Sequence, residues 1–142
     1  MRQIIVCVAL ALVACGGSSD TAAPTDAVSA AAGVYVLTQF KGVPLGPLTD
    51  AAGDVVTLSD TLTLRADHSY SDITSAVFRH PDGTVENDPP ETEAGAFDVV
   101  GTQITFTVHP ADGSPVFSYT GAIAAGKVSY TRENVEYGYT KL

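Results

Sequence analysis

The chain of 142 residues has no tryptophan, and it is poor in cysteine and in positive charge. Its two cysteines, Cys7 and Cys15, both lie near the N-terminus, so the rest of the sequence offers no thiol for a disulfide, a nucleophile or a metal site. Seven lysines and arginines stand against sixteen aspartates and glutamates, which gives a formal net charge of −9. An acidic chain repels phosphate backbones, and we therefore expect no nucleic acid among its partners.

Familiar catalytic motifs are missing as well. The sequence contains no G-x-S-x-G, no H-E-x-x-H and no phosphate-binding loop. Its serines, histidines and aspartates are scattered without the spacing of a catalytic triad. We therefore predict that the protein is not an enzyme and that it carries no cofactor.

Residues 4–14, IIVCVALALVA, form an apolar run of eleven residues, fewer than the roughly 20 that a membrane-spanning helix needs. The length fits the h-region of a secretory signal, and Arg2 supplies the positive charge before it. The run ends in LVAC at residues 12–15, which resembles the lipobox of bacterial lipoproteins. In that family the cysteine is diacylated and the signal is cut just before it. The resemblance therefore predicts a signal peptide over residues 1–14 and lipid attachment at Cys15.

Acyl chains on Cys15 predict a protein held at a membrane of the cell envelope, because two or more chains anchor stably. Gly16 stands where the best-known inner-membrane retention signal of the family has aspartate, so the resemblance favours the outer membrane in an organism that has one. The alternative is that Cys15 is only a small residue beside an ordinary cleavage site. The predicted partner at this end of the chain is the membrane itself.

Residues 15–32 are small and polar, with almost nothing to bury, and such a composition is typical of a flexible tether. One or two helical turns are predicted over residues 25–32, with Thr25 as the N-cap and Gly33 as the stop. The folded part then spans residues 33–142, which suffices for one domain with its own core.

The domain shows no sustained helical period. Short alternating segments rich in valine, threonine, tyrosine and phenylalanine, separated by turn residues, predict β-strands instead. The predicted strands cover residues 34–40, 54–66, 69–79, 92–100, 103–109, 115–123, 127–132 and 135–142. We also predict a β-bulge at Ser59-Asp60. Eight antiparallel strands with short links predict an all-β fold, either an up-and-down barrel or a sandwich.

Alternation assigns side chains to the two faces of these strands. Ile104, Phe106 and Val108 share one face of their segment, and Leu62 and Leu64 share one face of theirs. We expect these faces to point into the core.

Three short segments of the domain form a recognisable set: GVYVL at residues 33–37, GVPL at residues 42–45 and LTLRADHSY at residues 62–70. Together they resemble the small lipocalin-like domains of bacterial lipoproteins. The resemblance covers about residues 33–142 and implies a closed barrel of eight antiparallel strands. A barrel of that size holds either packed side chains or one small ligand.

The resemblance also implies roles for single residues. Tyr35 stands where lipocalins pack a tryptophan at the closed end of the barrel, and the arginine that partners it corresponds to Arg132 or Lys141. His68 stands at a turn position that usually holds glycine, where histidine tolerates a positive φ.

His80 and His109 each precede a proline in similar turns, after the third and fifth predicted strands. Such turns lie at the same end of an up-and-down barrel, so both imidazoles could meet Asp82, Glu86 or Asp112 in a zinc-type site. The simpler interpretation is structural, because a residue before proline is extended and His-Pro-Asp-Gly makes a good turn. We adopt the simpler interpretation and predict no metal site.

Two functions remain. In the first, a lipid-anchored envelope protein binds a small apolar or amphiphilic molecule in its barrel, where the six tyrosines could line a cavity. In the second, the barrel is filled and its loops contact another envelope protein. A cavity of ligand size separates the two. The sequence names neither the ligand-binding residues nor a protein partner.

Overall fold

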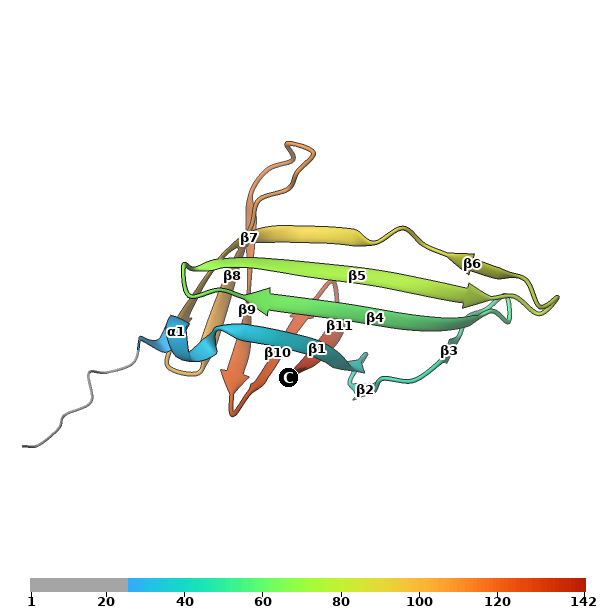
Figure 1. Ribbon diagram of the computed structural model, residues 1–142, viewed down its shortest axis with the longest axis horizontal. Coiled ribbons are helices and arrows are strands. Elements are labelled where there is room, and N and C mark those ends of the chain that lie inside the picture. The colour runs from blue at the N-terminus through green and yellow to red at the C-terminus, as the bar shows by residue number, and fades with distance from the viewer. Residues whose placement is uncertain (1–25) are drawn as a thin grey trace, which may run out of the picture.

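The computed structural model describes residues 26–142, so the predicted signal peptide, the predicted lipid attachment at Cys15 and most of the predicted tether lie outside the described residues. One short helix, α1 (Ala27–Ala31), precedes eleven strands (Figure 1). The strands are β1 (Gly33–Phe40), β2 (Val43–Pro44), β3 (Leu48–Thr49), β4 (Val55–Leu64), β5 (Ser69–Arg79), β6 (Val85–Asn87), β7 (Glu91–Val100), β8 (Gln103–Val108), β9 (Phe117–Ala124), β10 (Lys127–Arg132) and β11 (Val135–Lys141). All eight predicted strands are present.

The eight long strands close into a barrel. Neighbours pair antiparallel in the order β1, β11, β10, β9, β8, β7, β5 and β4, and β4 pairs with β1 again. Tyr35 of β1 pairs with Lys141 of β11 on one side and with Leu62 of β4 on the other. Because β1 has a partner on each edge, the ladder has no open side. The predicted eight-stranded up-and-down barrel is therefore confirmed, and the sandwich is excluded.

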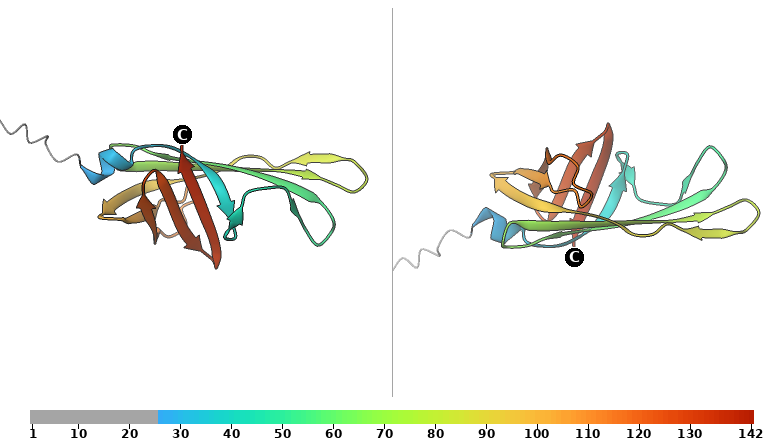
Figure 2. Two further views of the ribbon diagram at one scale, coloured as in Figure 1. Left: turned by 90° about the horizontal axis from the view of Figure 1, so that it is seen from below. Right: turned by 90° about the horizontal axis from the view of Figure 1, so that it is seen from above.

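The hairpin of β4 and β5 projects beyond the barrel. The two strands pair along the whole of β4, whereas β5 pairs with β7 only as far as Thr74. The outer part leaves the barrel as a long ribbon, and the short strands β3 and β6 pair with its two edges. Figures 1 and 2 show this ribbon extending away from the end that carries α1. The short strands β2, β3 and β6 lie in segments that the sequence analysis leaves as loops.

The ladder between β4 and β5 is uninterrupted, so the predicted bulge at Ser59-Asp60 is wrong. The register shift in the barrel lies instead in β1, between Leu37 and Gln39, opposite β11. Because no extra residue interrupts β4, strict alternation continues from Leu62 back to Asp60, and both side chains point into the barrel.

Inward-facing side chains fill the half of the barrel next to α1. Both predicted faces are buried: Ile104, Phe106, Leu62 and Leu64 belong to this core, and Val108 lies beyond Phe106 on the cavity wall. The ring of Phe106 stands near the middle, with its centroid 5.0 Å from the ring of Tyr70 and 5.0 Å from that of Tyr119. This aromatic layer separates the packed half of the barrel from the other half.

Helix α1 belongs to the folded unit, although it lies inside the segment predicted as a tether. Its N-cap is Asp26, whose carboxylate accepts a hydrogen bond from the backbone N–H of Val28 at 3.4 Å. Val28 and Ala31 are buried in the barrel core, so burial begins before residue 33. Within residues 26–142, no helix has both the length and the apolar character that crossing a membrane requires.

Tyr35 and Lys141 close the barrel under α1. The Tyr35 hydroxyl donates to the carbonyl oxygen of Ala31 at 2.6 Å. The Lys141 ammonium lies 5.7 Å from the centre of the Tyr35 ring and donates to the carbonyl oxygen of Ala32 at 2.6 Å. Of the two candidates for the cation beside Tyr35, Lys141 takes that place, and Arg132 lies at the other end of the barrel.

Candidate functional site

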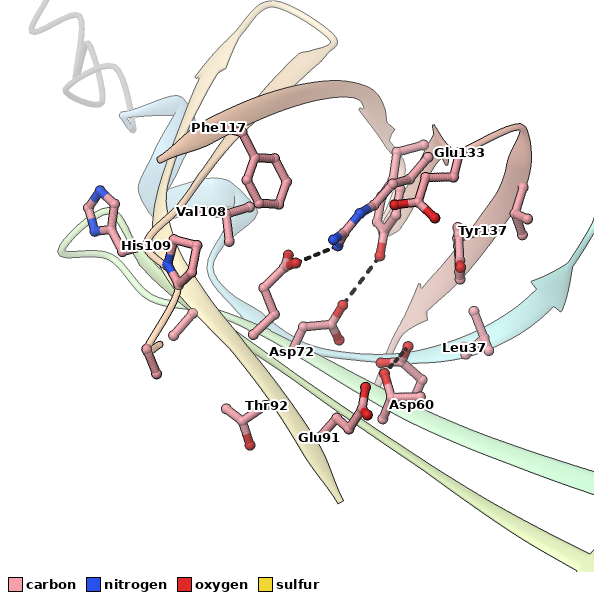
Figure 3. A pocket seen from close by; sticks show the side chains of 18 of the residues that line it. Leu37, Asp60, Asp72, Glu91, Thr92, Val108, His109, Phe117, Glu133 and Tyr137 are labelled. Atoms are coloured by element: carbon pink, nitrogen blue, oxygen red, sulfur yellow. Dashed lines mark hydrogen bonds and ion pairs between the residues drawn. The ribbon is translucent and has the colours of Figure 1, made fainter. Parts of the chain in front are cut away.

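A cavity of about 1000 Å³ occupies the half of the barrel opposite α1, within the range of small-molecule sites. All eight barrel strands contribute to its walls, with apolar side chains such as Leu37, Leu58 and Val108. Residues 109–112 and Glu133 also line it, and these belong to strand connections at the end away from α1. Figure 3 shows the lining side chains converging from strands and loops.

Two aspartates from neighbouring strands lie together on the cavity floor. In the ladder Asp60 faces Thr74 and Asp72 faces Leu62, so the aspartates are diagonal neighbours on the inner face. They retain only 6% and 7% of their surface. Oδ2 of Asp60 accepts hydrogen bonds from the Tyr139 hydroxyl at 2.9 Å and from Oγ1 of Thr74 at 3.0 Å.

A chain of phenols connects the two carboxyl groups. The hydroxyl of Tyr130 lies 2.8 Å from that of Tyr139 and 3.3 Å from Oδ2 of Asp72. Burial raises the pKa of both phenols, with the nearby carboxyl of Asp72 as a further cause. Both tyrosines therefore stay protonated and remain available as hydrogen-bond donors to the aspartates.

The Oδ1 atoms of Asp60 and Asp72 are buried, yet they accept no hydrogen bond from any other residue in the part of the chain that the structure describes. A buried carboxylate oxygen without a donor is costly. The pKa of Asp72 is raised to about 9, mainly because its carboxyl group is buried. The neighbouring carboxyl group of Asp60 raises this pKa further. Asp72 therefore holds a proton at neutral pH, and this proton, shared between the two carboxyls, offsets part of that cost.

A second polar group lies beside the aspartate pair, on the neighbouring strand β7, where Glu93 pairs directly with Asp72. Oε1 of Glu93 accepts hydrogen bonds from the hydroxyls of Tyr70 at 2.9 Å and Tyr119 at 3.0 Å, and Oε2 forms an ion pair with Arg132. The guanidinium of Arg132 also lies over the rings of Phe117, 5.1 Å from the centroid, and Tyr119, 5.7 Å away. Both carboxylate oxygens and the guanidinium are therefore already engaged.

The structure does not bring His80 and His109 together. Gly95 of β7 pairs with both Tyr70 of β5 and Val108 of β8, so these residues lie at one level. His109 follows Val108 by one residue, and His80 follows Tyr70 by ten residues. At about 3.3 Å per residue, the two histidines are separated by about 30 Å along the strand direction.

The histidines have separate surroundings. His80 contacts Asp54 at 3.0 Å and Glu86 at 3.5 Å near the tip of the ribbon, and the hydrogen bond with Asp54 raises the pKa of His80. His109 lies at the cavity mouth. His68 adopts the predicted positive φ, +66°, in the turn between β4 and β5. Among residues 26–142, no group of three or more histidine, cysteine, aspartate or glutamate side chains is arranged to hold a metal ion.

The sequence analysis did not identify the polar residues of the cavity, although strand alternation contains the signal. Asp60 has the same parity as Leu62, and Asp72 has the same parity as Tyr70. Extending each buried face by two residues would therefore have placed both aspartates inside the barrel. The predicted bulge at Ser59-Asp60 interrupts this alternation at Asp60, whereas nothing in the pattern of β5 interrupts it at Asp72.

Comparisons with known proteins give one structural likeness. No protein-family model matches the chain, and no curated protein matches it either. The fold is similar to the crystal structure of a lipocalin-like protein from Bacteroides uniformis, with 16% sequence identity and a TM-score of 0.42. The similarity covers 78% of this chain and 97% of that one. The assignment of the barrel itself rests on the strand pairing described above.

Proposed function

We propose that the protein binds a small amphiphilic molecule in the open half of its barrel, while acyl chains on Cys15 hold it at the cell envelope, in the outer membrane where the organism has one. The observation that carries the proposal is the cavity of about 1000 Å³ with two incompletely bonded aspartates on its floor. The proposed role is binding without chemical conversion.

The cavity suits a molecule with an apolar body and a polar head. Leu37, Leu58 and Val108 offer apolar wall, while the polar groups gather at the floor around Asp60 and Asp72. Ligand sites in proteins commonly combine a mostly apolar lining with a few convergent polar groups that fix orientation. A ligand that enters head first would place its polar end on the aspartates and its apolar body against the walls.

A filled barrel that serves only to present loops is less consistent with this arrangement. Filled barrels of eight strands close their interior with side chains, as the half next to α1 does here. The other half keeps a ligand-sized space and carries buried polar atoms that packed apolar side chains would not require.

The position of the chain entry is compatible with an anchor at Cys15. The described chain enters the barrel through α1 at one end (Figure 2). The cavity is lined by strand connections of the other end. A membrane anchor upstream of Asp26 would therefore attach on the closed side. The cavity mouth would be left free to exchange ligand with the surrounding aqueous compartment.

The test is to identify cargo in the protein as its own cells produce it. The full-length protein is isolated in lipid nanodiscs and denatured, and the released small molecules are analysed by mass spectrometry. The Leu58→Trp variant adds bulk inside the cavity, and Thr57→Trp adds the same bulk on the outer face of the same strand.

We expect one discrete compound, close to one molecule per chain, from the natural protein and from Thr57→Trp, and its loss from Leu58→Trp. The same lipid background from all three proteins, with no discrete compound, would contradict ligand binding in the barrel.

A further inference from the structure

The cavity is lined by charges of mainly one sign. Six of its lining side chains are carboxyl groups, and one is a guanidinium, that of Arg132. The whole chain is acidic as well. Clefts lined by one sign of charge concentrate ligands of the opposite sign.

Arg132 is poorly placed to attract an anion. It forms an ion pair with Glu93, and its guanidinium lies over the rings of Phe117 and Tyr119. An anionic head group would have to displace Glu93, whose other oxygen already accepts two phenol hydrogen bonds. Arg132 therefore interacts with other residues of the cavity wall and is not available to bind an anionic ligand.

The aspartate pair contains the polar atoms of the cavity lining whose hydrogen bonding is least complete. Asp60 and Asp72 are more than nine-tenths buried, both line the cavity, and the Oδ1 atom of each accepts no hydrogen bond from other residues within the described range. The remaining oxygens, both Oδ2 atoms, are held by Tyr139, Thr74 and Tyr130. The protein thus holds the two carboxyls through their Oδ2 atoms, while each Oδ1 atom is buried and has no N–H or hydroxyl donor within the described range.

We infer that the molecule bound in this cavity carries an amine, whose ammonium group donates hydrogen bonds to the carboxyl groups of Asp60 and Asp72. The inference rests on the proposed function and adds the chemistry of the ligand's head group. An ammonium group has three donors and a full positive charge, which matches two acceptor atoms in an acidic site. The rings of Tyr130 and Tyr137 in the lining add faces that attract a cation.

Binding of the ammonium replaces the proton that the two aspartates share. The proton on Asp72 leaves to solvent as the ammonium arrives, so the total charge of the pocket is unchanged and no second buried charge is left unpaired. The titratable and charged groups that face Asp72 from the surrounding strands are Asp60, Glu93, Tyr70, Tyr130, Tyr137 and Tyr139. The phenols stay protonated near neutral pH because burial raises the pKa of each, so the released proton is that of the aspartate pair.

The experiment compares three ligands that share one apolar body. Binding of 4-phenylbutylamine, 4-phenylbutan-1-ol and 4-phenylbutyrate to the full-length protein in phosphatidylcholine nanodiscs is measured by isothermal titration calorimetry, with empty nanodiscs as the reference. Each titration at pH 7.5 is repeated in two buffers of different ionisation enthalpy, which gives the number of protons released.

We expect the amine to bind at least about tenfold more tightly than the alcohol, and the carboxylate to bind most weakly, because charge-assisted hydrogen bonds are the strong ones. We also expect the amine, and not the alcohol, to release close to one proton for each molecule bound. Equal binding of all three, tighter binding of the carboxylate, or amine binding without proton release would overturn the amine inference and leave ligand binding intact. Failure of all three to bind would contradict the proposed function together with the inference.

Asp72→Asn supplies the matched variant. It keeps the shape of the protonated side chain but holds no proton to exchange, so we expect amine affinity to fall to that of the alcohol and proton release to vanish. Asp88→Asn removes an exposed carboxyl from a loop and should change neither quantity. Unchanged amine affinity in Asp72→Asn would overturn the inference. If that variant fails to fold, the number of protons that the natural protein releases on binding the amine still tests the inference.

Discussion

Asp60 and Asp72 lie diagonally across two neighbouring strands on the floor of the cavity, where burial, together with the carboxyl group of Asp60, raises the pKa of Asp72. Two buried carboxyls in one site cannot both ionise easily, because each charge raises the cost of the other. Their shared proton therefore links the stability of the barrel to pH, just as it links the pocket to a cationic ligand.

The first prediction concerns that pH dependence. The pKa of Asp72 is about 9 in the folded protein and 3.8 in the unfolded chain. Between these values the folded state holds a proton that the unfolded state has lost, so the contribution of Asp72 to stability falls as the pH rises from about 4 towards 9. One such group contributes a slope of about 1.4 kcal/mol for each pH unit. Urea unfolding at pH 5 and at pH 8.5 measures the difference.

Asp72→Asn should unfold with a flatter pH profile than the natural protein and should be the more stable of the two at pH 8.5. Because the pKa of His80 is raised by Asp54, His80 adds a slope of the same sign, and the comparison between variants isolates Asp72. Asp88→Asn should retain the natural slope. The prediction fails if Asp72→Asn and the natural protein lose stability in parallel.

The second prediction concerns the aromatic layer under the cavity. Phe106 is fully buried and packs against Tyr70, Tyr119 and Tyr130. Phe106→Ala should reduce the free energy of unfolding by about 3–5 kcal/mol, because it removes the ring and leaves a cavity. Val100→Ala, at a side chain that is 73% exposed, should cost less than about 0.5 kcal/mol. Similar losses in the two variants would show that Phe106 does not pack as described.

The third prediction concerns the closed end. Lys141→Met should destabilise the barrel by about 1–2 kcal/mol, because it removes the hydrogen bond to the Ala32 carbonyl and the cation over Tyr35. Lys127→Met, at an exposed lysine in the first position of β10, is the matched control and should have little effect. Thermal unfolding of the two variants decides, and equal melting temperatures would contradict a role for Lys141 in closing the barrel.

The fourth prediction concerns the N-terminus. If acyl chains on Cys15 anchor the protein, Cys15→Ser should move it from the membrane fraction to the soluble fraction of the envelope. Mass spectrometry of the natural protein should show a chain that begins at residue 15 with added acyl mass. Persistent membrane association of the serine variant would contradict the lipid anchor.

The strands and their order follow from local sequence patterns. Alternation of apolar and polar residues in segments such as 103–108 and 127–132 predicts both the strands and the faces that become buried. Turn-forming residues predict the connections between the strands. One of them is His68, which has the positive φ expected at its turn position. Short links between eight strands leave an up-and-down arrangement as the simplest one, and the barrel closes through β1.

The polar interior is less accessible from the sequence, because an aspartate inside a strand is normally taken as exposed. The hydroxyls that reach Asp72 and Asp60 come from Tyr130 of β10 and Tyr139 of β11, which are separated from them by 58 and 79 residues and lie on strands that do not pair with β4 or β5. The projection of β4 and β5 beyond the rim is also non-local, since it depends on where β7 stops pairing. It separates His80 from His109, which strand parity alone had placed at one end.

The most direct test of the account is a crystal structure of the protein purified from its own cell envelope, with whatever it carries. The account predicts continuous electron density for a small molecule in the open half of the barrel. A donor atom of that molecule should lie within hydrogen-bond distance of Oδ1 of Asp60 and Asp72. A cavity closed by inward-turned side chains, or one that contains only ordered water on the aspartate pair, would contradict it.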